Sequence, residues 1–114
     1  MDIRITHDKD TTMVRLCQPV STELEIDEVL ACVKRQLSRG RRTIAMSFRR
    51  AFFPYSKLLN LLVSCYRTLQ EAKGRFIVVS PSVEFDDVIE QTRLSSYIDV
   101  RMCRNRHEPT EATP

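Results

Sequence analysis

The chain has 114 residues, of which 42% are apolar and 29% charged, and its formal net charge is +3. This length and composition predict one globular domain with one core. Both signs of charge are abundant, so the small positive excess does not by itself indicate nucleic acid as a partner. The apolar stretches are interrupted well before the roughly 18 residues that a membrane span needs, so we expect a cytoplasmic protein without membrane insertion.

The four cysteines bear on the redox state. They form no C-x-x-C pair, and each lies in a segment with the apolar pattern of a strand or helix: Cys17, Cys32, Cys65 and Cys103. This usage is typical of reduced core residues in a cytoplasmic protein, and we therefore predict four free thiols.

The first forty residues predict a strand pair followed by a helix. Apolar and polar residues alternate on both sides of residues 7–11, which are expected to form an acidic, polar turn. From residue 21 to 40 the apolar residues recur at helical spacing, Thr22 and Glu25 form a capping-box pattern, and Gly40 supplies a stop signal.

Strands and helices then alternate along the chain. Residues 42–48, 75–80 and 96–103 are predicted to be strands, and residues 56–74 and 81–94 helices. Every predicted helix links two strands, and such crossovers favour parallel pairing. The prediction is a single α/β domain with a mixed sheet of about five strands and crossover helices, in the order β-β-α-β-α-β-α-β.

The predicted domain spans residues 1–103, and residues 104–114 lack an apolar pattern and are predicted to form a disordered tail. One of the two histidines, His107, falls in that tail, and the other, His7, falls in the first turn. Cys103 and His107 supply only two of the four ligands that a structural zinc site needs. With no phosphate-binding glycine motif either, we predict a protein that is not an enzyme and has no catalytic residue, metal or cofactor.

Two basic clusters leave open a minor alternative, a small anion- or nucleic-acid-binding domain. The first, Arg39 to Arg42, is expected at a helix C-terminus, where bases are favoured in any case. The second is Arg49 with Arg50. No aromatic residues interleave these arginines, which disfavours a platform for single-stranded nucleic acid.

Three longer phrases resemble one family, the STAS domain of anti-sigma-factor antagonists and of sulfate-transporter tails. "MVRLCQPVS" is similar to the family's second strand and the turn after it. "RTIAMSFRRAFFPYSKLLNLL" resembles its third strand running into the phosphoacceptor turn, and "FIVVSPSVEFDDVIEQTRL" its strand, proline turn and short helix. The resemblance covers residues 3–102, nearly everything except the tail.

The sequence departs from the family where the family's phosphorylation switch lies. The Asp-Ser-Ser/Thr-Gly motif falls on Pro54, Tyr55, Ser56 and Lys57, so only Ser56 matches directly as a possible phosphoacceptor. The family's aspartate after the second strand falls on Ser21, and the acids expected around the phosphoacceptor are missing. The alternative is that Pro54 presets the turn and Ser56 caps or borders the helix.

The resemblance implies a bacterial signalling module that controls transcription by binding a protein partner, namely an anti-sigma factor or a kinase-like regulator. The partner-binding residues are then expected to be Tyr55, Ser56, Lys57, Arg49 and Arg50. A second reading is an accessory subunit or scaffold of a membrane transport complex that is not phosphorylated. The sequence does not predict the oligomeric state.

Overall fold

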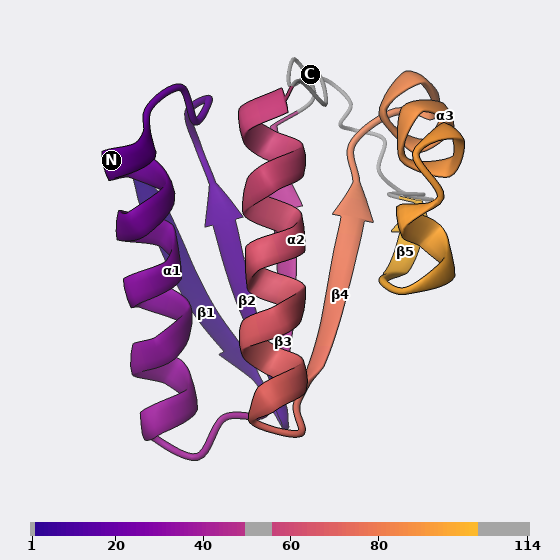
Figure 1. The fold of residues 1–114 in the computed structure, drawn as a ribbon. Coiled ribbons are helices and arrows are strands. Elements are labelled where there is room, and N and C mark those ends of the chain that lie inside the picture. Colours follow the sequence, from indigo (N-terminus) through magenta and orange to yellow (C-terminus); the bar gives the residue numbers. More distant parts are fainter. Residues whose placement is uncertain (1, 50–55, 103–114) are drawn as a thin grey trace.

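The computed structural model describes residues 2–49 and 56–102 of the chain, and these residues form one sheet with helices packed on it (Figure 1). The five strands are β1 (Ile3–Asp8), β2 (Thr11–Leu16), β3 (Thr43–Phe48), β4 (Arg75–Ser80) and β5 (Asp99–Met102). The helices are α1 (Glu23–Ser38), α2 (Ser56–Glu71), α3 (Val83–Gln91) and a short 3₁₀ turn, η1 (Leu94–Ser96). The α/β class and the predicted order of strands and helices are confirmed.

The strands lie in the sheet in chain order, β1-β2-β3-β4-β5. The hairpin strands β1 and β2 are antiparallel, with Ile3 opposite Leu16, and all other neighbouring pairs are parallel. This mixed pairing follows from the connections, because a tight turn can join only antiparallel strands while each crossover helix returns the chain to the same end of the sheet. The carboxyl ends of β2, β3 and β4 therefore meet at one end of the molecule.

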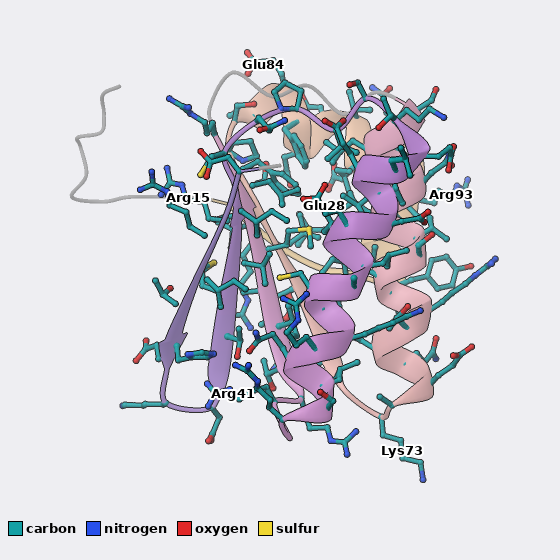
Figure 2. The ribbon with its side chains drawn as sticks, turned by 90° about the vertical axis from the view of Figure 1, so that its left-hand side faces the viewer. Arg15, Glu28, Arg41, Lys73, Glu84 and Arg93 are labelled. Atoms are coloured by element: carbon teal, nitrogen blue, oxygen red, sulfur yellow. The ribbon has the colours of Figure 1, made fainter. Side chains whose placement is uncertain are left out.

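Helices α1 and α2 cover one face of the sheet, and the core lies between the two layers (Figures 1 and 2). Every second residue of β2 and β3 is buried on this face, as the period of two in a strand requires: Val14, Leu16, Ile44, Met46 and Phe48. The helices contribute the apolar stripes that their sequences predicted, including Val29, Val33, Leu58, Leu61, Leu62 and Cys65. The sheet and helices thus bury the residues that the patterns assign to them.

The capping residues fix where α1 and α3 begin. The Thr22 hydroxyl accepts a hydrogen bond from the backbone N–H of Glu25 at 3.1 Å, which confirms the predicted cap. The Ser82 hydroxyl accepts one from the N–H of Phe85, also at 3.1 Å, and the Phe85 ring stacks on Phe48 with 5.2 Å between ring centroids. This cap and this ring contact hold α3 against the end of β3.

The structure corrects two sequence-based expectations. His7 lies in strand β1 rather than in the turn, and its Nε2 is 3.1 Å from Oε1 of the buried Gln36; the turn itself contains only Lys9 and Asp10. The extra strand residues extend the β1–β2 ladder to the pair of Asp8 with Thr11. Cys17 is only partly buried, because it lies past the end of β2 on the side that the helices leave uncovered.

The other two described cysteines, Cys32 and Cys65, are free and buried as predicted. Cys103 and the predicted tail lie outside the described residues. No helix within residues 2–49 and 56–102 is long and apolar enough to cross a membrane.

Candidate functional site

The predicted site lies around the start of α2, at the end of the molecule where the parallel strands terminate. Ser56 is the first residue of α2 and its side chain is exposed, while Lys57 is partly exposed beside it. Ser56 therefore borders the helix, whereas the capping position before it falls outside the described residues. Arg50, Pro54 and Tyr55 also fall outside them.

An ion pair joins the starts of the two long helices. The Lys57 Nζ lies 2.6 Å from Oε2 of Glu23, the first residue of α1. Both side chains keep substantial access to solvent, with 38% of Lys57 and 71% of Glu23 exposed, so the pair contributes at most about 1 kcal/mol to stability. The pair shows that the start of α2 lies close to the start of α1.

Helix starts gather at this end of the fold. Helices α1, α2 and α3 follow β2, β3 and β4 directly, so each begins at the carboxyl end of its strand (Figure 1). Each helix start carries unpaired backbone N–H groups and a partial positive charge. At the start of α1, the Glu25 carboxylate accepts hydrogen bonds from the Ser21 backbone N–H at 2.8 Å and from the Ser21 hydroxyl. These hydrogen bonds lower the pKa of Glu25.

Two exposed apolar residues at the helix starts were missed by the sequence analysis. Leu24, in the first turn of α1, is 79% exposed, and Val83, the first residue of α3, is 57% exposed. Leu24 stands outside the apolar stripe that begins at Ile26, and that mismatch is the signal that marks it as a surface residue. Exposed apolar residues that stand singly are common on protein surfaces, so Leu24 and Val83 do not by themselves mark a contact with another protein.

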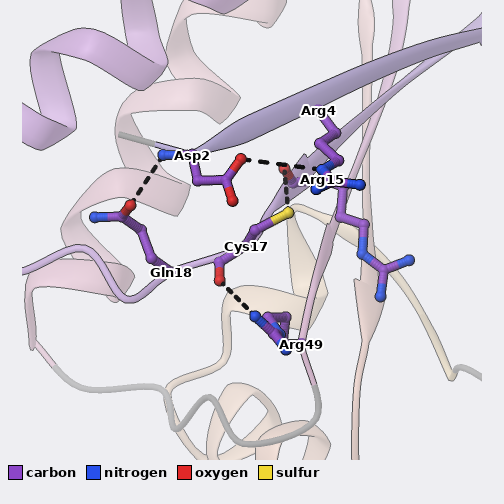
Figure 3. Close-up of polar contacts among 6 residues, drawn as sticks. All are labelled: Asp2, Arg4, Arg15, Cys17, Gln18 and Arg49. Carbon is purple, nitrogen blue, oxygen red and sulfur yellow. Dashed lines mark hydrogen bonds and ion pairs between the residues drawn. The ribbon is translucent and has the colours of Figure 1, made fainter.

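Arg49 is separated from Ser56 and Lys57 by the sheet. It follows β3 at a position that faces away from α1 and α2, and its Nη1 donates a hydrogen bond to the backbone carbonyl of Cys17 at 3.2 Å (Figure 3). Of the predicted partner-binding residues that the structure describes, Ser56 and Lys57 therefore lie together, and Arg49 faces the other side of the sheet.

The described residues offer binding groups at this end but no cluster of metal ligands. Among residues 2–49 and 56–102, no three His, Cys, Asp or Glu side chains are placed to hold a metal ion.

Comparisons with known proteins identify the fold. No family model and no curated protein sequence matches the chain. A solved STAS-domain anti-sigma-factor antagonist from Planctomyces limnophilus superposes with a TM-score of 0.64 at 21% identity, covering 93% of both chains. A candidate anti-sigma-factor antagonist from Thermotoga maritima gives a TM-score of 0.65 at 15% identity, covering 87% of this chain and 85% of that one.

A third match is the Bacillus cell-fate determinant SpoIIAA in its phosphorylated form. Its TM-score is 0.58 at 16% identity, and the match covers 87% of this chain and 90% of SpoIIAA. Together with the element order, these superpositions show that the chain has the fold of a STAS domain.

Proposed function

We propose that the protein is a non-enzymatic interaction module of STAS type in bacterial signalling, which binds an anti-sigma factor or a kinase-like regulator through the start of α2. The observation that carries the proposal is the exposed Ser56 as first residue of α2, in a fold that the solved anti-sigma-factor antagonists share. Tyr55, Lys57 and Arg50 complete the proposed partner-binding set, whereas Arg49 faces the other side of the sheet and is left out of it.

The surroundings of Ser56 support a docking surface. Lys57 is held toward α1 by Glu23, and Leu24 presents an exposed apolar side chain in the same first turn of α1. A surface that combines an apolar contact with exposed polar groups is typical of transient protein interfaces. The cytoplasm is the location that such a regulator implies.

Ser56 is also the proposed phosphoacceptor. A phosphate at a helix start adds negative charge where the free N–H groups and the dipole favour it, so the fold tolerates the modification. The same charge in an interface changes the affinity for a partner. SpoIIAA, one of the proteins with this fold, is known in a phosphorylated form, which supports a modification of this kind.

The test replaces Ser56 by aspartate. The partner is first captured from extracts of the source cell with the wild-type chain and identified by mass spectrometry, and its affinity for each variant is then measured by calorimetry. We expect Ser56→Asp to weaken binding by about 2 kcal/mol or more, roughly thirtyfold, because an unpaired carboxylate is buried in the interface. The melting temperature should stay nearly unchanged, since an acid is tolerated at a helix start.

Arg67→Gln is the matched control. Arg67 is exposed on the same helix, 11 positions after Ser56, and its replacement changes the net charge by the same single unit. This variant should bind as the wild type does. Equal affinities of Ser56→Asp and wild type would remove the start of α2 from the interface, and a large drop in melting temperature would identify Ser56 as a structural residue.

A further inference from the structure

A basic hollow lies on the face of the sheet that none of the described helices covers. In Figure 2 the side chain of Arg15 projects from this face, on the opposite side of the sheet from α1. The hollow has a volume of about 730 Å³, and the residues that line it include Asp2, Arg4, Met13, Arg15, Cys17 and Arg49. Figure 3 shows the charged side chains grouped around Cys17.

The register of the hairpin places two arginines side by side. Arg4 of β1 is directly opposite Arg15 of β2, and both belong to the uncovered face. Like charges at directly opposed positions of neighbouring strands disfavour folding. A local arrangement that works against stability is expected mainly where it serves binding. Arg49, at the end of β3, adds a third guanidinium to the same hollow.

Little of this charge is neutralised by the residues that the structure describes. Among the described residues that line the hollow, the one carboxylate is that of Asp2, whose Oδ1 lies 4.0 Å from Nε of Arg4. Within residues 2–49 and 56–102, no carboxylate lies within ion-pair distance of Arg15. Three guanidinium groups against one carboxylate leave an excess of two positive charges.

We propose that this hollow binds an acidic segment of a protein partner, with its carboxylates paired to Arg4 and Arg15 and the complex extending toward Arg49. Planar guanidinium groups bind carboxylates through paired hydrogen bonds, which makes arginine the favoured residue for such contacts. The surface is distinct from Ser56 and Lys57, because it lies on the other face of the sheet. It is therefore a second binding surface, independent of the proposed function.

The shape and lining of the hollow favour a polypeptide over other anions. The hollow is open to solvent: the Arg4 side chain, which lines it, is 74% exposed. Its walls therefore do not enclose a single small anion. Among residues 2–49 and 56–102, no aromatic side chain lines it, whereas binding of single-stranded nucleic acid usually relies on stacked aromatics. Met13 supplies a flexible apolar floor of the kind found at peptide-binding surfaces.

The test measures binding of a fluorescein-labelled peptide in which glutamate alternates with alanine and leucine, at low ionic strength, by fluorescence anisotropy. The same peptide with glutamine in place of glutamate is the neutral probe. We expect the full-length wild type to bind the acidic peptide and not the neutral one. Arg15→Gln should weaken binding about fivefold, the loss expected for an exposed charge pair, and adding Arg4→Gln should weaken it further.

Arg67→Gln removes the same charge from the helix layer and should bind the acidic peptide as the wild type does. Thr6→Glu, on the exposed edge strand at the rim of the hollow, provides a second variant that should weaken binding through repulsion, by about as much as Arg15→Gln does. Circular dichroism establishes that each variant is folded. Absence of binding by the wild type, or equal losses in Arg15→Gln and Arg67→Gln, would overturn the proposal. An oligothymidylate that binds more tightly than the peptide and responds to Arg15→Gln would make the hollow a nucleic-acid site instead.

Discussion

The two faces of the sheet differ in what their residues do. On the face under α1 and α2, the side chains of Val14, Leu16, Ile44 and Met46 are completely buried and form the core. On the other face, the exposed Arg15 lies between Val14 and Leu16 of β2, and it is opposite the partly buried Ser47 of β3. Ala45 on this face is buried too, so the contrast is sharpest near β1 and β2. Among residues 2–49 and 56–102, the buried apolar core therefore lies mainly on one face, and the proposed second binding surface lies on the opposite face.

The largest expected difference between the faces is in thiol reactivity. Burial raises the pKa of Cys65, under the helices, to about 12, whereas Cys17 lies on the uncovered face and is only partly buried. At pH 8 a thiol with that pKa is ionised to only about one part in ten thousand, and the thiolate is the reactive form. We expect iodoacetamide to label Cys17 faster than Cys65 by orders of magnitude in the native protein, because Cys65 is both buried and scarcely ionised.

Peptide mapping by mass spectrometry resolves the cysteines in one time course. Cys32, whose pKa burial also raises, should be protected as Cys65 is. Labelling in denaturant, where the rates should converge, serves as the control. Rapid native labelling of Cys65 would mean that the helix layer does not seal this face.

Two consecutive residues of β2 provide the next comparison. Leu16 is completely buried under the helices, and Arg15 projects from the uncovered face. Leu16→Ala should reduce the free energy of unfolding by about 2–5 kcal/mol, because it removes apolar contacts and leaves a cavity. Arg15→Ala should change it by less than about 0.5 kcal/mol, as expected of a surface substitution.

Urea denaturation of both variants measures these changes. If Arg4 and Arg15 repel each other across the strands, Arg15→Ala should be slightly more stable than the wild type at low salt. A loss for Arg15→Ala as large as that for Leu16→Ala would contradict the division between the two faces.

Most of the fold was predictable because it follows from local patterns. The apolar periods identified the strands and helices, Thr22 identified the start of α1, and the strand–helix alternation predicted the parallel part of the sheet. The predicted turn, residues 7–11, was too long, because the turn in the structure contains only Lys9 and Asp10. His7 is polar, but its contact with Gln36, 29 residues away, exists only in the folded chain and is invisible in the sequence.

The site was predictable only in part. The resemblance pointed to Ser56, which the structure places at an exposed helix start. The ion pair of Lys57 with Glu23 and the opposition of Arg4 and Arg15 join residues from different elements, and they depend on helix packing and strand register. Alternation predicted the strand pair, but Arg4 and Arg15 were not among the predicted site residues, because only the register of the hairpin makes them neighbours.

Removing the cap of α1 should change the free energy of unfolding by less than Leu16→Ala does and by more than Arg15→Ala does. Thr22→Ala removes the acceptor for the Glu25 N–H. We expect a loss of about 1 kcal/mol in the free energy of unfolding, measured by urea denaturation. Thr22→Ser keeps a hydroxyl acceptor and should retain most of the stability. Equal losses in both variants would indicate that the methyl group, rather than the cap, is important.

The smallest effect is expected from the carboxylate of Asp99, which links β4 and β5 through Arg75. Burial raises the pKa of Asp99, but hydrogen bonds from Arg101 at 3.1 Å and Arg75 at 2.8 Å, together with their charges, outweigh it and lower the pKa below its usual value of 3.8. The folded state therefore favours the ionised carboxylate, and its contribution to stability is present above the unfolded pKa and is lost as the pH falls through the folded pKa. Asp99→Asn should be slightly less stable than the wild type at neutral pH; the difference in melting temperature should begin to shrink as the pH falls below about 4 and should vanish below the folded pKa. The difference should be small and should shrink in high salt, because both arginines are more than half exposed.

Melting temperatures measured by circular dichroism from neutral to acidic pH, at low and high salt, test this. A difference that persists in acid would mean that Asp99 stabilises the protein through packing rather than through its charge.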